Sequence, residues 1–399
     1  MTHNTGPLLG VRVVEMGQLI AGPFSAKTLA DLGATVIKIE PPKSGDPLRQ
    51  WRMLHEGTSV WWEAQSRNKQ SVAIDLRQAE GQQLARQLIA GADILIENFR
   101  PGTLESWGMS YEELSLNNRG LIMLRISGYG QTGPYRDLPG FGAIGEAMGG
   151  LRHLTGNPGE VPVRVGLSIG DTLAALHGTI GVLSALFARE NNGGIGQVID
   201  MALYEAVFNC TESLLPEYSA FGAIRGPAGS ALPGITPSNA YPCQDGYVLI
   251  AGNGDSIYQR LMKAIGREDL ALDPALTNNK GRSEHAERID QAISDWTQHR
   301  SLEKVLNILA EAAVPAGKIY TVKDISEDPH YQAREMIQTV TTAQGLTLKV
   351  PGIIPKLSKT PGSIRHRAPQ LGEHTDAVLK ELGLEETLIH TLREKGIIQ

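Results

Sequence analysis

"VRVVEMGQLIAGPFSAKTLADLGATVIKIE", residues 11–40, is the stretch that decides the fold. Its opening residues, VRVVEM, have the apolar character of a buried strand. Residues 23–33 show helical spacing and end at Gly33, a residue that commonly terminates helices. TVIKIE, residues 35–40, predicts a second strand. A strand, a helix and a strand joined by short turns predict a parallel βαβ unit.

The same alternation continues as far as residue 127. Strand patterns occur in SVAIDL (71–76), DILIEN (93–98) and LIMLRIS (121–127), and EGQQLARQLIAG (80–91) has a helix pattern. We therefore predict an α/β fold whose large domain holds a Rossmann-like, doubly wound parallel sheet. Ligands of such sheets bind outside the carboxyl ends of the strands, so the turns after these strands are the expected place of a site.

The composition changes after this part of the chain. Glycine and proline are dense over residues 128–170, as in a long functional loop or a crossover, and helical spacing returns over 171–190. We predict a large catalytic domain over 1–221, a linker over 222–239 and a smaller α/β domain over 240–323. A return segment over 324–399 is expected to pack on the large domain.

The overall composition is that of an ordinary globular protein, with 41% apolar and 20% charged residues. The net charge of −6 argues against a nucleic-acid partner. Cys210 and Cys243 lack C-x-x-C spacing and the histidines are scattered, so we expect neither disulfides nor a metal site. No secretory signal pattern is present, and the longest apolar segment, residues 179–188, is about half of a bilayer span. We expect a cytoplasmic protein that binds no membrane.

"VGLSIGDTLAAL", residues 165–176, contains two candidate nucleophiles. Ser168 matches the G-x-S-x-G elbow of serine hydrolases, but the helix pattern begins at Asp171 and no H-G-G-G-like segment precedes the serine. A hydrolase would need one of three distant histidines as its base: His285, His330 or His374. Asp171 suits a helix N-cap, which local sequence favours, and it equally suits a carboxylate nucleophile that the helix dipole keeps ionised. The spacing leaves both roles open.

A nicotinamide-dependent dehydrogenase also begins with strand, turn, helix and strand. In this chain the turn GQLIAGPF, residues 17–24, holds only Gly17 and Gly22 and lacks the G-x-G-x-x-G pattern. Pro23 stands where helix amides would bind pyrophosphate. This turn argues against a dinucleotide site.

Seven segments, each weak by itself, follow one another along nearly the whole chain. They are VVEMGQLIAGPFSAKTLADLGATVIKIEPPKSGD (13–46), RNKQSVAIDL (67–76), ILIENFRPG (94–102), SGYGQTGPYRDLPGFGAIGEAMGG (127–150), GDTLAALHGTIGVLSAL (170–186), GQVIDMALYEAV (196–207) and LGEHTDAVLKELG (371–383). Together they resemble the family III CoA-transferases, the CaiB/BaiF family. The resemblance implies a Rossmann-like large domain, a small domain, and two chains that interlock as a homodimer.

The resemblance also implies a covalent mechanism. Asp171 matches the nucleophile, whose carboxylate would attack an acyl-CoA thioester and form an aspartyl mixed anhydride, and an aspartyl-CoA thioester would follow in the exchange. Coenzyme A thioesters would be substrates, with no prosthetic group. The positions that match CoA contacts are Ile20, Ala21, Ile74, Asp75, Arg77, Asn98, Phe99 and Arg100. Pro41 and Pro139 replace basic residues of some members, so the grip on CoA must differ in detail.

Further positions bear on the acyl group. The racemase branch of the family has Gly-His-Asp where this chain has Gly140, Phe141 and Gly142, which cannot exchange protons, so transfer is favoured over racemisation. Phe141 is then expected to wall the acyl pocket. Glu146 would hydrogen-bond the reacting group or a water, unless it is only a surface carboxylate. Gly252, Asn253 and Gly254 resemble the glycine-rich lid of the family, with an ordinary turn as the alternative.

The resemblance is strongest to members that use small dicarboxylates, with succinyl-CoA as a donor and acids such as malate, citramalate, itaconate or oxalate as acceptors. Arg152 or Arg164 could then pair with the distal carboxylate. The partners implied are an acyl-CoA, a free carboxylic acid and a second copy of the chain. A serine hydrolase that uses Ser168 and a non-catalytic acyl-CoA-binding protein are the alternatives.

Overall fold

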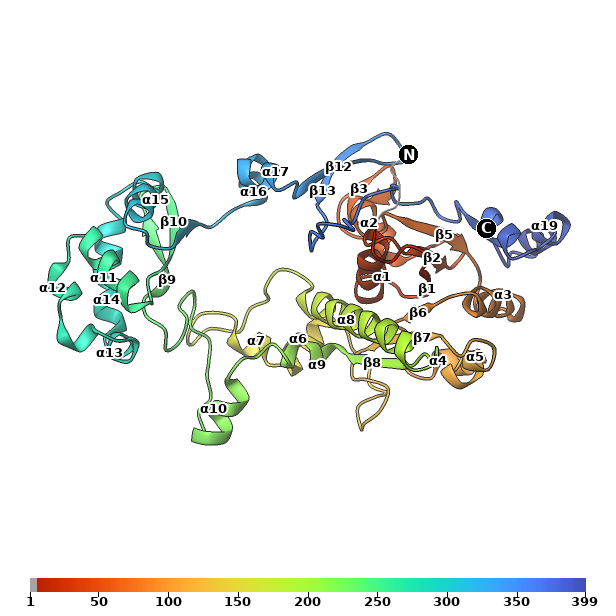
Figure 1. Ribbon diagram of the computed structural model, residues 1–399, viewed down its shortest axis with the longest axis horizontal. Helices are drawn as coiled ribbons and strands as arrows, with labels where there is room; N and C mark the ends of the chain where they lie inside the picture. The colour runs from red at the N-terminus through yellow and green to blue at the C-terminus, as the bar shows by residue number, and fades with distance from the viewer. Residues whose placement is uncertain (1–5) are drawn as a thin grey trace. The chain divides into compact units, whose positions relative to one another are not determined.

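The computed structural model describes residues 6–399, which divide into two compact units (Figure 1). The larger unit comprises the described residues up to Arg152 together with Arg164–Ile224 and Ala333–Gln399. The smaller unit comprises His153–Val163 and Arg225–Gln332, whereas the sequence placed a small domain at 240–323 and a linker at 222–239. The difference arises because the expected linker is bonded within the smaller unit, where the amide of Gly229 donates to the carbonyl of Gly156 at 2.9 Å.

The larger unit is built on a six-stranded sheet with the order β5-β2-β1-β6-β7-β8. All neighbouring strands run parallel, and Val14 of β1 lies opposite Ile37 of β2 and Leu95 of β6. The strands are β1 (Arg12–Glu15), β2 (Thr35–Glu40), β5 (Lys69–Ala73), β6 (Ile94–Glu97), β7 (Ile122–Ser127) and β8 (Val198–Ala202). The predicted α/β fold is confirmed. The chain reverses its direction of winding between β1 and β6, the place at which doubly wound sheets bind ligands.

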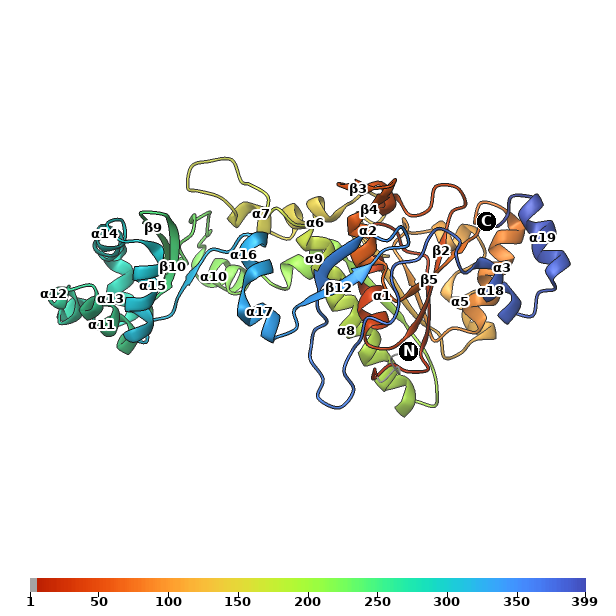
Figure 2. The ribbon, with the colours of Figure 1, turned by 90° about the horizontal axis from the view of Figure 1, so that it is seen from above.

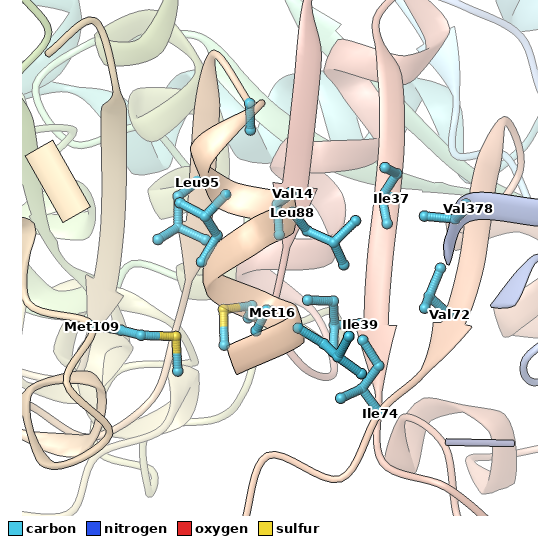
Figure 3. Close-up of a cluster of buried hydrophobic side chains, with 14 of the residues drawn as sticks. Val14, Met16, Ile37, Ile39, Val72, Ile74, Leu88, Leu95, Met109 and Val378 are labelled. Atoms are coloured by element: carbon cyan, nitrogen blue, oxygen red, sulfur yellow. The ribbon is translucent and has the colours of Figure 1, made fainter. Parts of the chain in front are cut away.

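Each face of the sheet is covered by helices. One apolar cluster joins Val14, Ile37 and Val72 of the strands to Leu88 of α3 and Val378 of α18 (Figure 3). The helices on that side are α3 (Ala79–Ala90), α5 (Tyr111–Asn117), α18 (Thr375–Glu381) and α19 (Glu386–Glu394), which lie together in Figures 1 and 2. The second cluster lies between the other face and the helices α1 (Ala21–Asp31), α8 (Ile169–Asn191) and α9 (Leu203–Phe208). Alternate residues along each strand therefore point into separate cores.

The remaining elements complete the two units. The larger unit also holds η1 (Pro47–Gln50), β3 (Leu54–His55), β4 (Thr58–Ser59), α2 (Val60–Gln65), α4 (Thr103–Ser106), α6 (Gly142–Met148), α10 (Leu214–Phe221), β12 (Ile337–Thr341) and β13 (Thr347–Pro351). The smaller unit holds β9 (Ser238–Cys243), β10 (Gly246–Ala251), α11 (Asp255–Ala264), α12 (Glu268–Ala271), η2 (Pro274–Leu276), α13 (Asn279–Glu284), α14 (Ala286–Thr297), α15 (Leu302–Glu311), β11 (Ala316–Lys318) and α16 (Val322–Glu327). Two of the four boundaries between the units fall inside α7 (Leu151–Leu154) and α17 (Pro329–Ala333).

Helix α8 has two different faces. Ala174, Gly178, Val182 and Ala185 are buried, which fits the contact of this face with the second core. The opposite face exposes four large apolar side chains at helical spacing: Leu176, Ile180, Leu183 and Phe187. By length and composition α8 could cross a membrane, a test that core helices also pass. The larger unit therefore carries an exposed apolar stripe along α8.

Candidate active site

The carboxyl ends of β1, β6 and β7 surround a cavity, here called the central cavity. Its walls include seven of the residues that the sequence singled out: Ile20, Ala21, Asn98, Phe99, Arg100, Phe141 and Asp171. Pro139 also lines it. The cavity therefore lies at the reversal point of the sheet and brings together residues from distant turns.

A second cavity, here called the edge cavity, lies at the carboxyl ends of β2 and β5. It is lined by Ile74, Asp75 and Arg77, together with Pro41 and Trp107. Gln18 and Phe99 border both the central and the edge cavity, so the two adjoin. The Arg77 side chain is 84% exposed and forms a 2.8 Å ion pair with Asp75. The hydrogen bond from Arg77 is the main cause that lowers the pKa of Asp75 to about 2.

A third cavity, here called the arginine cavity, also reaches Asp171. It is lined by Leu19, Ile20, Trp51, Arg52, Trp61, Phe141, Gly142, Ala143, Arg164, Ser168 and Asp171. Ile20, Phe141 and Asp171 line the central cavity as well. Asp171 is therefore a wall that the two cavities share.

The turn after β1 is held by side chains from other elements. Asn98, after β6, accepts a hydrogen bond from the amide of Gln18 at 2.7 Å and donates to the carbonyl of Gln18 at 2.9 Å. Asp46 accepts from the amide of Leu19 at 3.0 Å, and Leu19 has a left-handed φ of 64°. The buried Lys38 forms a 2.9 Å ion pair with Asp46. The side chain of Asn98 thus fixes the turn that bears Ile20, in addition to lining the cavity.

Asp171 stands in the first turn of α8. The helix begins at Ile169 and its N-cap is Ser168, so the expectation that the helix begins at Asp171 is wrong, and so is the N-cap interpretation of this aspartate. The glycines around residues 166–170 interrupt the helical pattern, so the sequence did not indicate a start at Ile169. Burial, the main cause, and the charge of Glu146 together raise the pKa of Asp171 to about 6, and the charge of Arg164 opposes them. The carboxylate is therefore half-buried and still mostly ionised at neutral pH.

Helix α6 packs its amino end against this carboxylate. A methyl group on Gly142 would lie 2.0 Å from Oδ2 of Asp171, and one on Gly170 would lie 2.8 Å from the carbonyl oxygen of Gly142. One turn along α6, Glu146 is 1% exposed, and Oε1 has no hydrogen-bond partner among residues 6–399. Glu146 is therefore no surface carboxylate.

The two arginines proposed for a distal carboxylate differ in their surroundings. Arg152 lies 3.6 Å from Oε2 of Glu146 and is not among the lining residues of the three cavities. Arg164 lines the arginine cavity, 3.8 Å from Oε1 of Glu146. It also lies 3.5 Å from Oγ of Ser168. Arg164 is the better placed of the two.

Several expected contacts lie elsewhere or serve other purposes. His374, one candidate base for Ser168, accepts a hydrogen bond from the amide of Ser71 at 3.3 Å. Gly252, Asn253 and Gly254 form the turn between β10 and α11 in the smaller unit. A methyl group on Gly252 would lie 2.6 Å from Cδ2 of Leu261, so packing alone calls for glycine there. The lid role of this turn stays a prediction.

Sequence reasoning missed Trp51, Arg52 and Trp61. They follow the carboxyl end of β2 and come to the cavity through the short hairpin of β3 and β4. The available signal was a basic and aromatic pair, Trp51 and Arg52, in a turn at the expected edge of the sheet. Among the residues that the structure describes, no group of three or more metal-binding side chains occurs.

Comparison with known proteins identifies the family. The family model described as "CoA-transferase family III" matches residues 8–375. The chain is 46% identical to the succinyl-CoA–D-citramalate CoA-transferase of Chloroflexus aurantiacus over 395 residues, which cover 98% of each chain. It is 34% identical to the succinate–glutarate CoA-transferase of Agrobacterium fabrum over 96% of this chain and 97% of that one.

A solved structure has the same fold. The crystal structure of a CaiB/BaiF family protein from Brucella suis superposes with a TM-score of 0.83 and 35% identity, covering 94% of this chain and 99% of that chain. This match agrees with the family model and with the relatives in sequence. The chain belongs to CoA-transferase family III, the CaiB/BaiF family, and is a CoA-transferase.

Proposed function

We propose that Asp171 is the nucleophile of this CoA-transferase and that the acyl group is bound beside it in the arginine cavity. The single observation that carries the proposal is the position of its carboxylate, which is shared by the central cavity and the arginine cavity. The central cavity adjoins the edge cavity, so a CoA chain can follow the strand ends from Asp171 to Arg77. Thiol and acyl group would then lie on either side of one carboxylate.

The reaction needs no other nucleophilic side chain of the protein. An Asp171 oxygen attacks the thioester carbonyl, the carbon–sulfur bond breaks, and CoA leaves as a thiolate that stays bound. The thiolate then attacks the aspartyl carbonyl of the anhydride, releasing the first acid and leaving an aspartyl-CoA thioester. The incoming acid attacks that thioester to form a new anhydride, and the returning thiolate completes the exchange. The thioester's free energy is kept as long as water is excluded.

The raised pKa of Asp171 fits this role. A carboxylate whose pKa is about 6 remains ionised at neutral pH and is more basic than an exposed aspartate. Gly142 leaves room for the carboxylate, whereas any larger side chain there would collide with it. The same glycine stands where the racemase branch has an aspartate, so the geometry supports transfer.

For substrates we propose succinyl-CoA or a similar acyl-CoA as donor and a small dicarboxylic acid as acceptor. The support is the naming of relatives, which act on succinyl-CoA with D-citramalate, L-malate or mesaconate, or on succinate and glutarate. Arg52 and Arg164 supply positive charge in the arginine cavity. Cations suit an acid that carries a second carboxylate.

We also propose that the protein works as an interlocked homodimer in the cytoplasm. The support for a partner is the apolar stripe of α8, which exposes 61% of Ile180 and 72% of Phe187. A second copy of the chain would cover such a stripe. Gel filtration with light scattering tests the dimer, and a monomer at micromolar concentration would contradict it.

Trapping of the intermediate tests the chemistry. After incubation with succinyl-CoA, intact-protein mass analysis with hydroxylamine or borohydride trapping should locate the modification on Asp171. Asp171→Asn should abolish both adduct and transfer, whereas Ser168→Ala should keep the adduct. Thioester hydrolysis that is lost in Ser168→Ala and kept in Asp171→Asn would instead support the serine hydrolase. Bound CoA without any new thioester across many donors and acids would support a non-catalytic binding protein.

A further inference from the structure

The arginine cavity contains a cation that the carboxylates of the larger unit leave unpaired. Arg52 lines this cavity with Trp51 and Trp61. Its guanidinium carbon lies 4.5 Å from the centre of the Trp61 ring, a cation–π contact. Within residues 6–399 no carboxylate forms an ion pair with Arg52. Its N–H donors are therefore available to a ligand.

Arg49, three residues earlier, has both an aromatic neighbour and a carboxylate partner. Arg49 stacks on Trp62 at 3.7 Å in the same way, but it also donates to both oxygens of Glu40, each at 2.8 Å. Arg49 is buried and structural. Arg52 has the aromatic support without the carboxylate, and it is exposed, so its charge is accessible to an anion that enters the arginine cavity.

The protein positions Arg52 through its backbone. The buried hydroxyl of Ser59 donates to the carbonyl of Trp51 at 2.6 Å and accepts from the amide of Trp61 at 3.1 Å. This bridge sets the two indole rings 6.2 Å apart. Arg52 itself has a left-handed φ of 61°, which is uncommon for a residue with a side chain. The hairpin, rather than a counter-ion, therefore holds the guanidinium at the cavity.

Arg164, the other cation of the cavity, is partly engaged. Its guanidinium lies 3.8 Å from Oε1 of the buried Glu146. Its charge also lowers the pKa of Asp171. Arg164 thus balances the two carboxylates of the site, which leaves Arg52 as the cation that can accept a further one.

We propose that Arg52 binds the far carboxylate of the acyl group, so that the arginine cavity selects acyl groups that end in a carboxylate. A planar guanidinium binds a carboxylate through two parallel hydrogen bonds, and the Trp61 ring supports the guanidinium of Arg52. This inference rests on the proposed acylation of Asp171. It names a specificity residue that neither the motifs nor the order of strands identified.

Isotope exchange tests the proposal without knowledge of the natural acceptor. The enzyme is incubated with succinyl-CoA and ¹³C-succinate, or with butyryl-CoA and ¹³C-butyrate, and label in the thioester is followed by mass spectrometry. The two acyl groups have the same carbon chain and differ only in the far carboxylate. Wild type should prefer the succinyl pair, and Arg52→Gln should lower the succinyl-to-butyryl ratio of kcat/KM by roughly 10- to 100-fold.

Two further variants serve as controls. Arg52→Lys keeps a point charge but loses the bidentate geometry, so its ratio should fall between those of wild type and Arg52→Gln. Arg119→Gln removes an exposed arginine at the amino-terminal edge of the sheet, before β7, and should leave the ratio at its wild-type value. Because each ratio is internal to one variant, a lower fraction of folded enzyme does not change it.

The outcomes separate this inference from the proposed function. An unchanged ratio in Arg52→Gln, or equal exchange of both acids by wild type, would overturn the role of Arg52 while transfer through Asp171 stands. Absence of exchange with either pair, together with absence of an Asp171 adduct, would overturn the proposed function and this inference with it. A reduced succinyl exchange with a reduced ratio supports both.

Discussion

Replacement of Gly142 by alanine should disable the nucleophile without unfolding the protein. The added methyl group would lie 2.0 Å from Oδ2 and 2.7 Å from Cγ of Asp171, and ordinary contacts begin at 3.4 Å. The carboxylate oxygen must therefore retreat by about 1.4 Å, the difference between 3.4 and 2.0 Å. A misplacement of about 1 Å in a reacting group can cost roughly 100-fold in rate, or about 2.7 kcal/mol of transition-state stabilisation.

The assay is the rate at which succinyl-CoA releases CoA in a single turnover, read together with the mass of the acylated protein. We expect Gly142→Ala to lower this rate roughly 100-fold. Its melting temperature should stay close to that of wild type, because Gly142 has no left-handed φ and begins a helix, where alanine is favourable. The displaced atoms belong to a side chain that can rotate.

Gly145→Ala is the matched control. Gly145 lies in the same helix, but the three atoms nearest to its methyl group would belong to Leu203 and Tyr204, with Cβ of Leu203 at 2.9 Å, and none of them to Asp171. Overpacking there should cost about 1–3 kcal/mol of unfolding free energy while the acylation rate of the folded enzyme is retained. If Gly142→Ala acylates within about twofold of wild type, the reasoning that this glycine sets the carboxylate's position is refuted.

Three further predictions concern the site and its support. The acylation rate should fall as the pH drops below about 6, the pKa of Asp171. Glu146→Gln should shift this pH–rate profile toward lower pH, because the charge of Glu146 raises the pKa of Asp171. A shift of the profile to higher pH would contradict the effect assigned to Glu146. Arg77→Ala should raise KM roughly tenfold for all CoA thioesters alike in steady-state kinetics, if the exposed guanidinium binds a phosphate of CoA. Asp46→Asn should lower the unfolding free energy by about 3–5 kcal/mol in urea titrations, because it leaves the buried Lys38 under-compensated; a loss of less than about 1 kcal/mol would argue against that pairing.

The sequence predicted the sheet and the turns that carry the cavities. The alternation of apolar runs with helical spacing up to residue 127 was enough to predict a parallel sheet, which the structure confirms. Strand ends are local features, and the carboxyl ends of parallel strands share one edge of the sheet. For this reason the turns that bear Ile20, Asp75 and Asn98 line adjoining cavities, as their positions after three strands implied.

The neighbours of Asp171 could not be read from the chain. Gly142 and Glu146 reach it because α6 packs closely on α8, and Arg52 lines the same cavity because a short hairpin bends back beside the strand ends. The start of α8 was predicted too late in the chain, because the spacing of apolar residues does not reveal which backbone amides are free.

By itself, then, the sequence determined the fold class, the edge of the sheet at which the cavities lie and the resemblance to a transferase family. Only the tertiary structure decided which charges surround the nucleophile and that Glu146 is buried. It also decided that Arg152 pairs with Glu146, whereas Arg52 contacts Trp61 and has no carboxylate partner among the described residues. The physical reason is the separation along the chain of the residues that each effect involves. Strand and helix formation depends on periodicities within a few residues, whereas burial and charge pairing depend on contacts between separate elements of the chain, which only packing brings together.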